Sequence, residues 1–243
     1  MRVSLVPRGQ ADQFDVDAPN YRIAHSALAA RCHGVPKMTS KGFVVHDSNS
    51  PERIMADSLT LWHTEHVNFA RLLDLLEEQV AEFHQGERPD YTLMSDILYY
   101  MRNFADRVHH PPEDVAYARL AERDPGVQLL VNRLLQEHCV IATAGEELLN
   151  CLKEISEDVL APRSHLEAAT ATYLVYYRHH LATEERVVMP RAAQVLTGED
   201  WAAVAAAVPG GSDPLFGDDI LERFEMLRRQ IDRVAQASRQ DQT

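Results

Sequence analysis

The feature that most constrains this chain is a helical apolar pattern that recurs in four long segments, each interrupted by histidine. Between residues 51 and 198, apolar side chains repeat at alternating steps of three and four. This spacing places them on one face of an α-helix, which must be buried against other helices. The first segment illustrates the pattern, with the series Leu59, Trp62, His66, Phe69, Leu73, Leu76, Val80 and Phe83.

Turn and capping residues separate these segments and set their lengths. Pro51 follows Ser50 at an expected helix start, and Gly86 is expected to end that helix. The pattern predicts further helices from about 90 to 123, from 127 to 159, and from 162 to about 187, where Pro190 disturbs it; a kink or restart is expected at Pro111-Pro112. Four long amphipathic helices joined by short turns indicate an all-α, up-down-up-down four-helix bundle.

The chain therefore divides into an irregular N-terminal arm (1–50), the bundle (51–198) and a C-terminal helical tail (199–243). The tail is expected to hold a helix from 199 to about 208 and another from about 218 to 234. Within the arm, Leu5-Val6-Pro7-Arg8-Gly9 resembles an engineered thrombin-cleavage linker, and Met38 could be an authentic start. We assign no chemistry to the arm.

Composition excludes several classes of function. Aspartate and glutamate number 37 against 24 lysines and arginines, for a net charge of -13, so the chain should repel nucleic acid. No apolar run approaches the roughly 20 residues that cross a bilayer, and no signal segment follows Met1. Three cysteines at unrelated spacings give no disulfide framework. We expect a soluble, cytoplasmic protein without membrane or nucleic-acid partners.

The polar residues on the apolar faces repeat between the two halves of the bundle. The first and third helices each carry Glu-His, and the second and fourth each carry His-x-x-x-Glu. A spacing of four residues places imidazole and carboxylate on one helix face. The inward residues are His66, His109, Glu113, His138, His180 and Glu184.

Four imidazoles and two carboxylates would be costly to bury without a partner, so a cation is expected among them. Imidazole and carboxylate without thiolate suit iron, manganese or zinc. Six donors with two carboxylates able to bridge exceed the needs of one tetrahedral zinc, which favours two ions.

At these positions the chain resembles the hemerythrin-like (HHE cation-binding) family, over about residues 51–196. The motifs that carry the resemblance are Glu65-His66-Val67, Phe104 to Asp114, Glu137-His138, and Tyr177 to Glu185 followed by Met189-Pro190. The resemblance implies a four-helix bundle around two Fe ions, an oxo- or hydroxo-bridged di-iron centre. It implies terminal ligands at His66, His109, His138 and His180, and bridging carboxylates at Glu113 and Glu184.

One position departs from the oxygen-carrying hemerythrins. Where they have a second histidine one turn after the third-helix ligand, this chain has Ala142. His63, His110 or water could take its place, although either histidine would need its helix to rotate or kink. The departure disfavours reversible oxygen carriage and favours chemistry with peroxide or nitric oxide.

Other polar residues near the expected ligands have two interpretations. Glu65, Asp114, Glu137 and Glu185 are either solvated charges or hydrogen-bond partners of the ligands, and His179 is expected at the surface. Tyr173 and Tyr177 lie a turn or two before His180 on its face and are the expected hydrogen-bond donors to a bound ligand.

The leading hypothesis is a di-iron protein that binds O2, NO or peroxide for sensing, scavenging or iron handling, with a redox partner protein as a further expectation. Alternatives are an enzyme or iron-centre repair factor that turns over peroxide or NO, and a helical interaction module with a structural ion. A ferritin-like site is disfavoured because no histidine has glutamate three positions before it.

Overall fold

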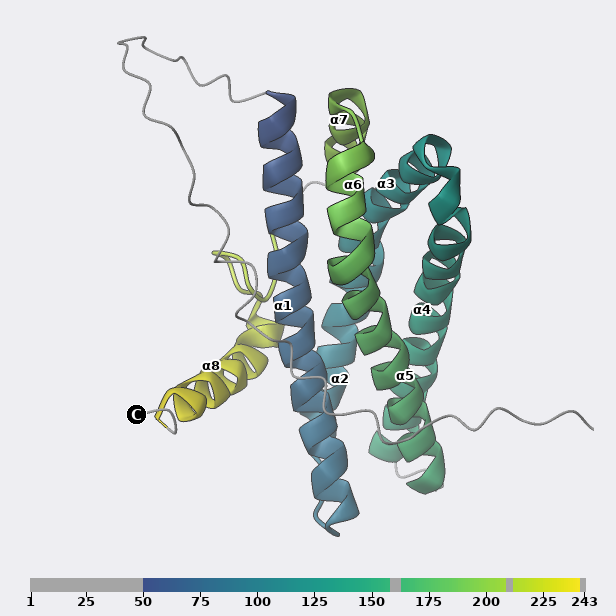
Figure 1. Cartoon of the computed structure of the whole chain (residues 1–243). Helices are drawn as coiled ribbons and strands as arrows, with labels where there is room; N and C mark the ends of the chain where they lie inside the picture. Colours follow the sequence, from purple (N-terminus) through teal and green to yellow (C-terminus); the bar gives the residue numbers. More distant parts are fainter. Residues whose placement is uncertain (1–49, 158–162, 209–211, 241–243) are drawn as a thin grey trace, which may run out of the picture. The chain divides into compact units, whose positions relative to one another are not determined.

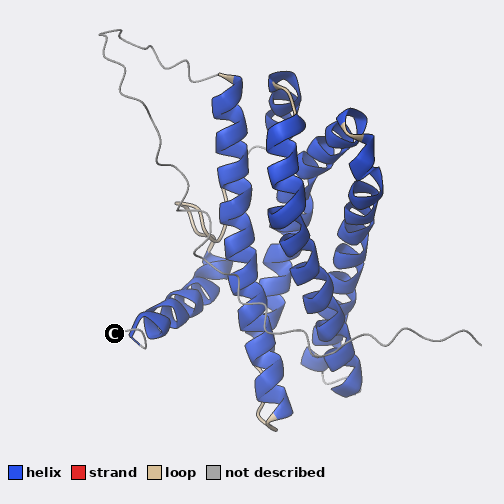
Figure 2. Cartoon of the chain, in the orientation of Figure 1, coloured by secondary structure: helices blue, strands red, loops and turns tan. Residues whose placement is uncertain are grey.

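The computed structural model describes residues 50–157, 163–208 and 212–240, and all regular structure among them is helical (Figures 1 and 2). The predicted all-α class is confirmed. Apart from Ser50, the predicted N-terminal arm lies outside the described residues. The elements are α1 (Pro51–His84), α2 (Tyr91–Tyr100), the π-helix η1 (Met101–His109), α3 (His110–Arg123), the 3-10 turn η2 (Pro125–Val127), α4 (Gln128–Ser156), α5 (Arg163–Thr183), the π-helix η3 (Glu184–Val188), α6 (Met189–Val195), α7 (Gly198–Ala207), the 3-10 turn η4 (Glu222–Phe224) and α8 (Glu225–Gln240).

The first two helices end and begin where capping chemistry predicts. Gly86 follows the end of α1 with a φ of 86°, a conformation that glycine adopts without steric cost. Asp90 precedes α2, and its carboxylate accepts hydrogen bonds from the backbone N–H groups of Thr92 and Leu93. Ser50 occupies the position before α1 without a side-chain cap, and Pro51 supplies the helix start.

Four long helical rods contain the predicted segments: α1, the continuous run 91–123, α4, and the continuous run 163–195. We refer to them as the first to fourth rods. Helix α1 packs on α2 and α5, and α4 packs on the same two helices. Each rod therefore packs against the rods that precede and follow it in the chain. The fourth rod also packs against the first.

Two apolar clusters fill the space between the rods, and a polar layer separates them. On each rod the inward histidine lies between a residue of one cluster and a residue of the other; on α1, His66 lies between Trp62 and Phe69. One cluster includes Phe69, Leu98, Ile141 and Tyr177, and the other includes Trp62, Leu120, Leu134, Val188 and Trp201.

Both His-x-x-x-Glu rods contain a π-helical turn just before a proline. The N–H of His110 donates to the carbonyl of Ala105, and that of Met189 donates to the carbonyl of Glu184, each five residues earlier. A proline follows each donor and has no N–H, and its ring would clash with the carbonyl four residues before it in an α-helix. The wider turn relieves this conflict, and α-helix resumes afterwards.

The tail begins with α7, which packs on α1 and α3. Trp201 of α7 lies against Trp62, with ring centroids 5.9 Å apart. The last helix begins at Glu225 rather than near 218 as predicted. The carboxylate of Asp213 accepts hydrogen bonds from the N–H groups of Leu215 and Phe216, which folds this stretch into a turn. Among the described residues, none of the helices has the length and apolar character needed to span a bilayer.

Candidate metal centre

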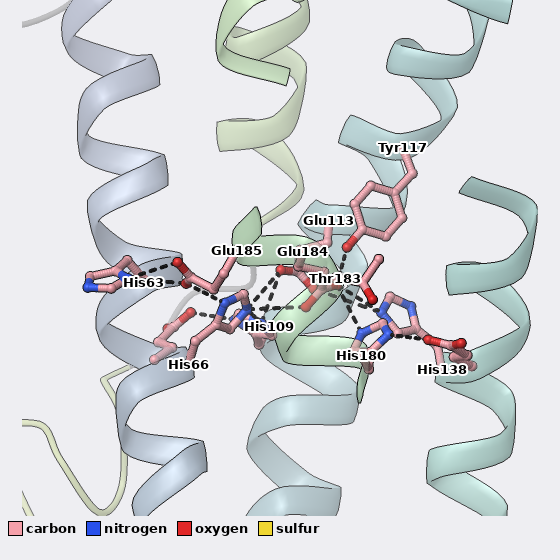
Figure 3. Close-up of polar contacts among 12 residues, drawn as sticks. His63, His66, His109, Glu113, Tyr117, His138, His180, Thr183, Glu184 and Glu185 are labelled. Atoms are coloured by element: carbon pink, nitrogen blue, oxygen red, sulfur yellow. Dashed lines mark hydrogen bonds and ion pairs between the residues drawn. The ribbon is translucent and has the colours of Figure 1, made fainter. Parts of the chain in front are cut away.

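The six side chains expected as ligands lie close together (Figure 3). They form the polar layer between the two apolar clusters. Each rod contributes to the layer: the first and third supply one histidine each, and the second and fourth supply a histidine and a glutamate. Their exposed fractions are 3% for His66, 2% for His109, 1% for Glu113, 8% for His138, 0% for His180 and 1% for Glu184.

Two of the histidines form one group of donor atoms with Glu113. The Nε2 atoms of His66 and His109 lie 3.0 Å apart, and they lie 3.3 Å and 3.2 Å from Oε1 of Glu113. Donor atoms around an ion with bonds of about 2.1 Å are about 3.0 Å apart in an octahedron and about 3.4 Å apart in a tetrahedron. The group therefore has the spacing of adjacent metal ligands.

The other two histidines form a second group with Glu184. Nε2 of His180 lies 2.9 Å from Oε1 of Glu184, and Nε2 of His138 lies 3.8 Å from the same oxygen. The two carboxylates connect the groups, because Oε2 of Glu184 is 3.5 Å from Nε2 of His66 and Oε2 of Glu113 is 3.9 Å from Nε2 of His138. Each carboxylate thus offers one oxygen to each pair of histidines.

Several of these atoms have no hydrogen-bond partner, although they are fully buried. They are Oε2 of Glu113, Nε2 of His138, Nε2 of His180 and Oε2 of Glu184. Leaving such atoms unpaired costs several kcal/mol in an apolar interior, and buried polar groups are normally satisfied. Cations bound among them would satisfy all four, and imidazole nitrogen with carboxylate oxygen is a donor set typical of iron, manganese or zinc. The residues present fit a metal centre.

A ring of four carboxylates holds the outer nitrogens of the histidines. Each carboxylate is adjacent in sequence to an inward residue of its own rod, yet it accepts a hydrogen bond from the histidine of the next rod in chain order. The carboxylate of the fourth rod accepts from the histidine of the first rod. Because each Nδ1–H donates to a carboxylate, the Nε2 atom of each ring faces the centre. The bonds are His109 Nδ1 to Glu65 at 2.6 Å, His138 Nδ1 to Asp114 at 2.8 Å, His180 Nδ1 to Glu137 at 3.3 Å and His66 Nδ1 to Glu185 at 2.8 Å.

The carboxylates also determine the protonation of the centre. Burial alone would lower the pKa of His66, but the facing carboxylates of Glu113, Glu185 and Glu184 outweigh it and raise this pKa to about 10. The pKa of His138 is raised to about 10 by the same balance. Without an ion, protons therefore occupy the positions that a cation would take.

One buried tyrosine contacts the centre and was not expected from the sequence. The hydroxyl of Tyr117 donates a hydrogen bond to Oε1 of Glu184. The sequence analysis favoured Tyr173 and Tyr177 instead; Tyr177 is buried, and its hydroxyl has no hydrogen-bond partner. Tyr117 lies four residues after Glu113, and this spacing was the signal that could have identified it.

The two histidines considered for the missing fifth position differ sharply in location. The side chain of His63 is 55% exposed and contacts Glu185 at 3.1 Å, on the outside of the carboxylate ring. His110 is 4% exposed, and its ring stacks on that of His138 with centroids 4.0 Å apart. His179 is half-exposed, as expected, and lies 3.4 Å from Glu137.

Comparison with known proteins identifies the family. The model of the hemerythrin HHE cation binding domain matches residues 57–192, more than half of the chain and the whole span of the inward residues. No curated protein and no solved structure matches the chain significantly. With this match added to the helical fold and the buried histidine-carboxylate layer, the chain belongs to the hemerythrin HHE cation-binding domain family.

Proposed function

We propose that the protein is a non-haem di-iron protein that binds O2, NO or peroxide, with residues 51–198 as an up-down-up-down four-helix bundle that carries the centre. In this proposal, His66 and His109 bind one iron, and His138 and His180 bind the other. Glu113 and Glu184 would each offer one oxygen to each ion.

The observation that carries the proposal is the position of the two buried carboxylates. One oxygen of each faces one pair of histidines, and its other oxygen faces the second pair. A single-ion site would not need two carboxylates spread across two separate histidine pairs. The arrangement supports two ions, each with two imidazole nitrogens and two carboxylate oxygens.

Four donors for each ion leave positions free on iron, which commonly takes six. A closed structural zinc site would instead be satisfied by four, typically including thiolate. When bound, the irons supply a reversible change of oxidation state and open positions for a small ligand. Cys139 is the cysteine nearest in sequence to an expected ligand, because it directly follows His138. Its side chain is exposed on the outer face of α4 and so does not offer a thiolate to the site.

The surrounding residues prepare the site in three ways. The two apolar clusters limit access of bulk water to the layer. The carboxylate ring holds the Nδ1 side of each imidazole, so the Nε2 atoms are directed inward before an ion arrives. The hydroxyl of Tyr117 holds Glu184 in position through a hydrogen bond.

Metal analysis with optical spectroscopy tests the proposal. Anaerobically purified protein should contain about two irons per chain, and exposure to O2 or peroxide should produce near-ultraviolet charge-transfer bands. The paired variant Glu113→Ala, Glu184→Ala should contain no iron, whereas replacing two exposed carboxylates, Glu122→Ala and Glu146→Ala, should leave the iron content unchanged. Stoichiometric zinc without such bands, after growth with sufficient iron, would contradict the assignment.

We place the protein in the cytoplasm, since Cys139 and Cys151 are unpaired in the described part of the chain, as expected in a reducing compartment. A redox partner protein would return the irons to the reduced state between encounters with a ligand. Peroxide or NO consumption at steady state, abolished in His109→Ala, would extend the proposal from binding to turnover.

A further inference from the structure

The ion assigned to His138 and His180 lies on the side of the centre where the sequence departs from oxygen-carrying hemerythrins. The position one turn after His138 is Ala142, which has no donor atom. A third histidine nevertheless reaches this side. A ring nitrogen of His110 belongs to a buried group with donor atoms of Glu113, His138 and His180, all within 4.8 Å of one another.

The π-helical turn explains why His110 faces inward. In a regular α-helix it would point about 100° away from its neighbour His109. The turn that ends with the bond from the N–H of His110 to the carbonyl of Ala105 is wider, and both histidines are directed toward the interior. Pro111 favours this turn, since it has no N–H for the α-helical pattern.

The outer nitrogen of His110 also faces a carboxylate, at a longer distance than in the four expected ligands. Its Nδ1 lies 3.6 Å from Oδ1 of Asp106, one turn earlier on the same rod. This oxygen is buried and has no hydrogen-bond partner. The carboxylate beside Nδ1 leaves Nε2 of His110 for the interior, which is the arrangement that a carboxylate-backed metal ligand adopts.

We infer that His110 is a fifth histidine ligand, which completes the ion held by His138 and His180 and replaces the histidine absent at position 142. The inference rests on the proposed di-metal centre. The rings of His110 and His138 are nearly parallel, at 12°, so one ring must tilt out of the stack for both to bind the same ion. Counting the coordinated imidazoles is therefore the direct test.

The count can be made by proton NMR on the full chain loaded with cobalt(II). Each coordinated imidazole whose Nδ1–H donates to a carboxylate gives one strongly shifted, exchangeable resonance. The wild-type protein should give five such resonances and His110→Ala four. His63→Ala, which removes an exposed histidine outside the centre, should still give five.

A second pair of variants separates ligand loss from loss of packing. His110→Gln, in which the side chain is similar in size, should also give four resonances. Both His110 variants should lose one of the two ions to a competing chelator at least tenfold more readily than the wild type. Even residues that only hydrogen-bond a metal ligand contribute up to about 100-fold to metal affinity. Adding Ala142→His to His110→Ala should restore the fifth resonance and ion retention. Four resonances in the wild type, with two ions bound, would overturn the inference and leave the di-metal centre intact. A chain that binds no ion would refute the proposed function itself.

Discussion

Replacing Glu65 with glutamine should weaken metal retention, although Glu65 is not expected to touch an ion. Its carboxylate accepts the Nδ1–H of His109 at 2.6 Å, and both side chains are buried. Glutamine keeps the size of the side chain and an acceptor oxygen, but it removes the charge that makes the imidazole a stronger donor to metal.

The structure sets the size of this effect. A short, buried hydrogen bond to a charged group contributes about 1.5–3 kcal/mol, which corresponds to a loss of metal affinity of about 10- to 150-fold. Asp114→Asn makes the same chemical change beside His138, where the carboxylate is 48% exposed. Water screens that bond, so we expect it to contribute less than about 1 kcal/mol. Asp114→Asn should therefore weaken metal affinity by less than about fivefold.

Transfer of iron to a competing chelator under anaerobic conditions measures both variants in parallel. Glu146→Gln, an exposed glutamate paired with Arg102 at 3.2 Å, is the matched control and should behave as wild type. Equal losses in Glu65→Gln and Asp114→Asn, or no loss in Glu65→Gln, would refute the reasoning that buried carboxylates strengthen the ligands.

Two further predictions concern pH. The pKa values of His66 and His138 are raised to about 10 in the metal-free site, so below about pH 10 an ion must displace the protons of both rings. Metal affinity should therefore rise by up to about 100-fold per pH unit, and a titration at pH 7 and pH 8 showing equal affinities would contradict this. Burial would raise the pKa of Asp200, but its bond to Arg123 outweighs this and lowers the pKa to about 2. The pair should therefore stabilise the fold above about pH 4 and lose this contribution as the pH falls through about 2. Acid unfolding of Asp200→Asn compared with wild type measures it, and a difference in stability that is as large at pH 2 as at pH 5 would exclude the ion pair as its cause.

The sequence predicted the helices and the inward residues because both depend on local periodicity. A histidine that replaces an apolar residue in a regular series, as His66 and His138 do, must share the buried face of its helix. The structure places all six expected side chains in one buried layer. Their role as metal ligands remains a prediction.

The position of His110 could not be derived from α-helical periodicity, which assigns it to a different face from His109. The π-helical turn changes that relation, and its cause, Pro111, was visible only as an expected kink or restart. The start of the last helix was misplaced for a similar reason: Asp213 forms a local turn that periodicity does not reveal.

The carboxylate ring depends on packing between rods, and this also lies beyond the reach of local patterns. Glu65 and Glu137 precede inward histidines on their own helices and point away from those apolar faces. Each lies against the next rod instead, where it accepts a hydrogen bond from His109 or His180. The sequence left two interpretations open for these residues, and the structure supports the role of hydrogen-bond partner.

The central claim is that two cations bind between the buried carboxylates Glu113 and Glu184. A crystal structure of anaerobically iron-loaded protein, with anomalous data collected on both sides of the iron absorption edge, tests this most directly. We predict two iron peaks, one beside His66 and His109 and the other beside His138 and His180. A single peak, or iron outside this layer, would contradict the account.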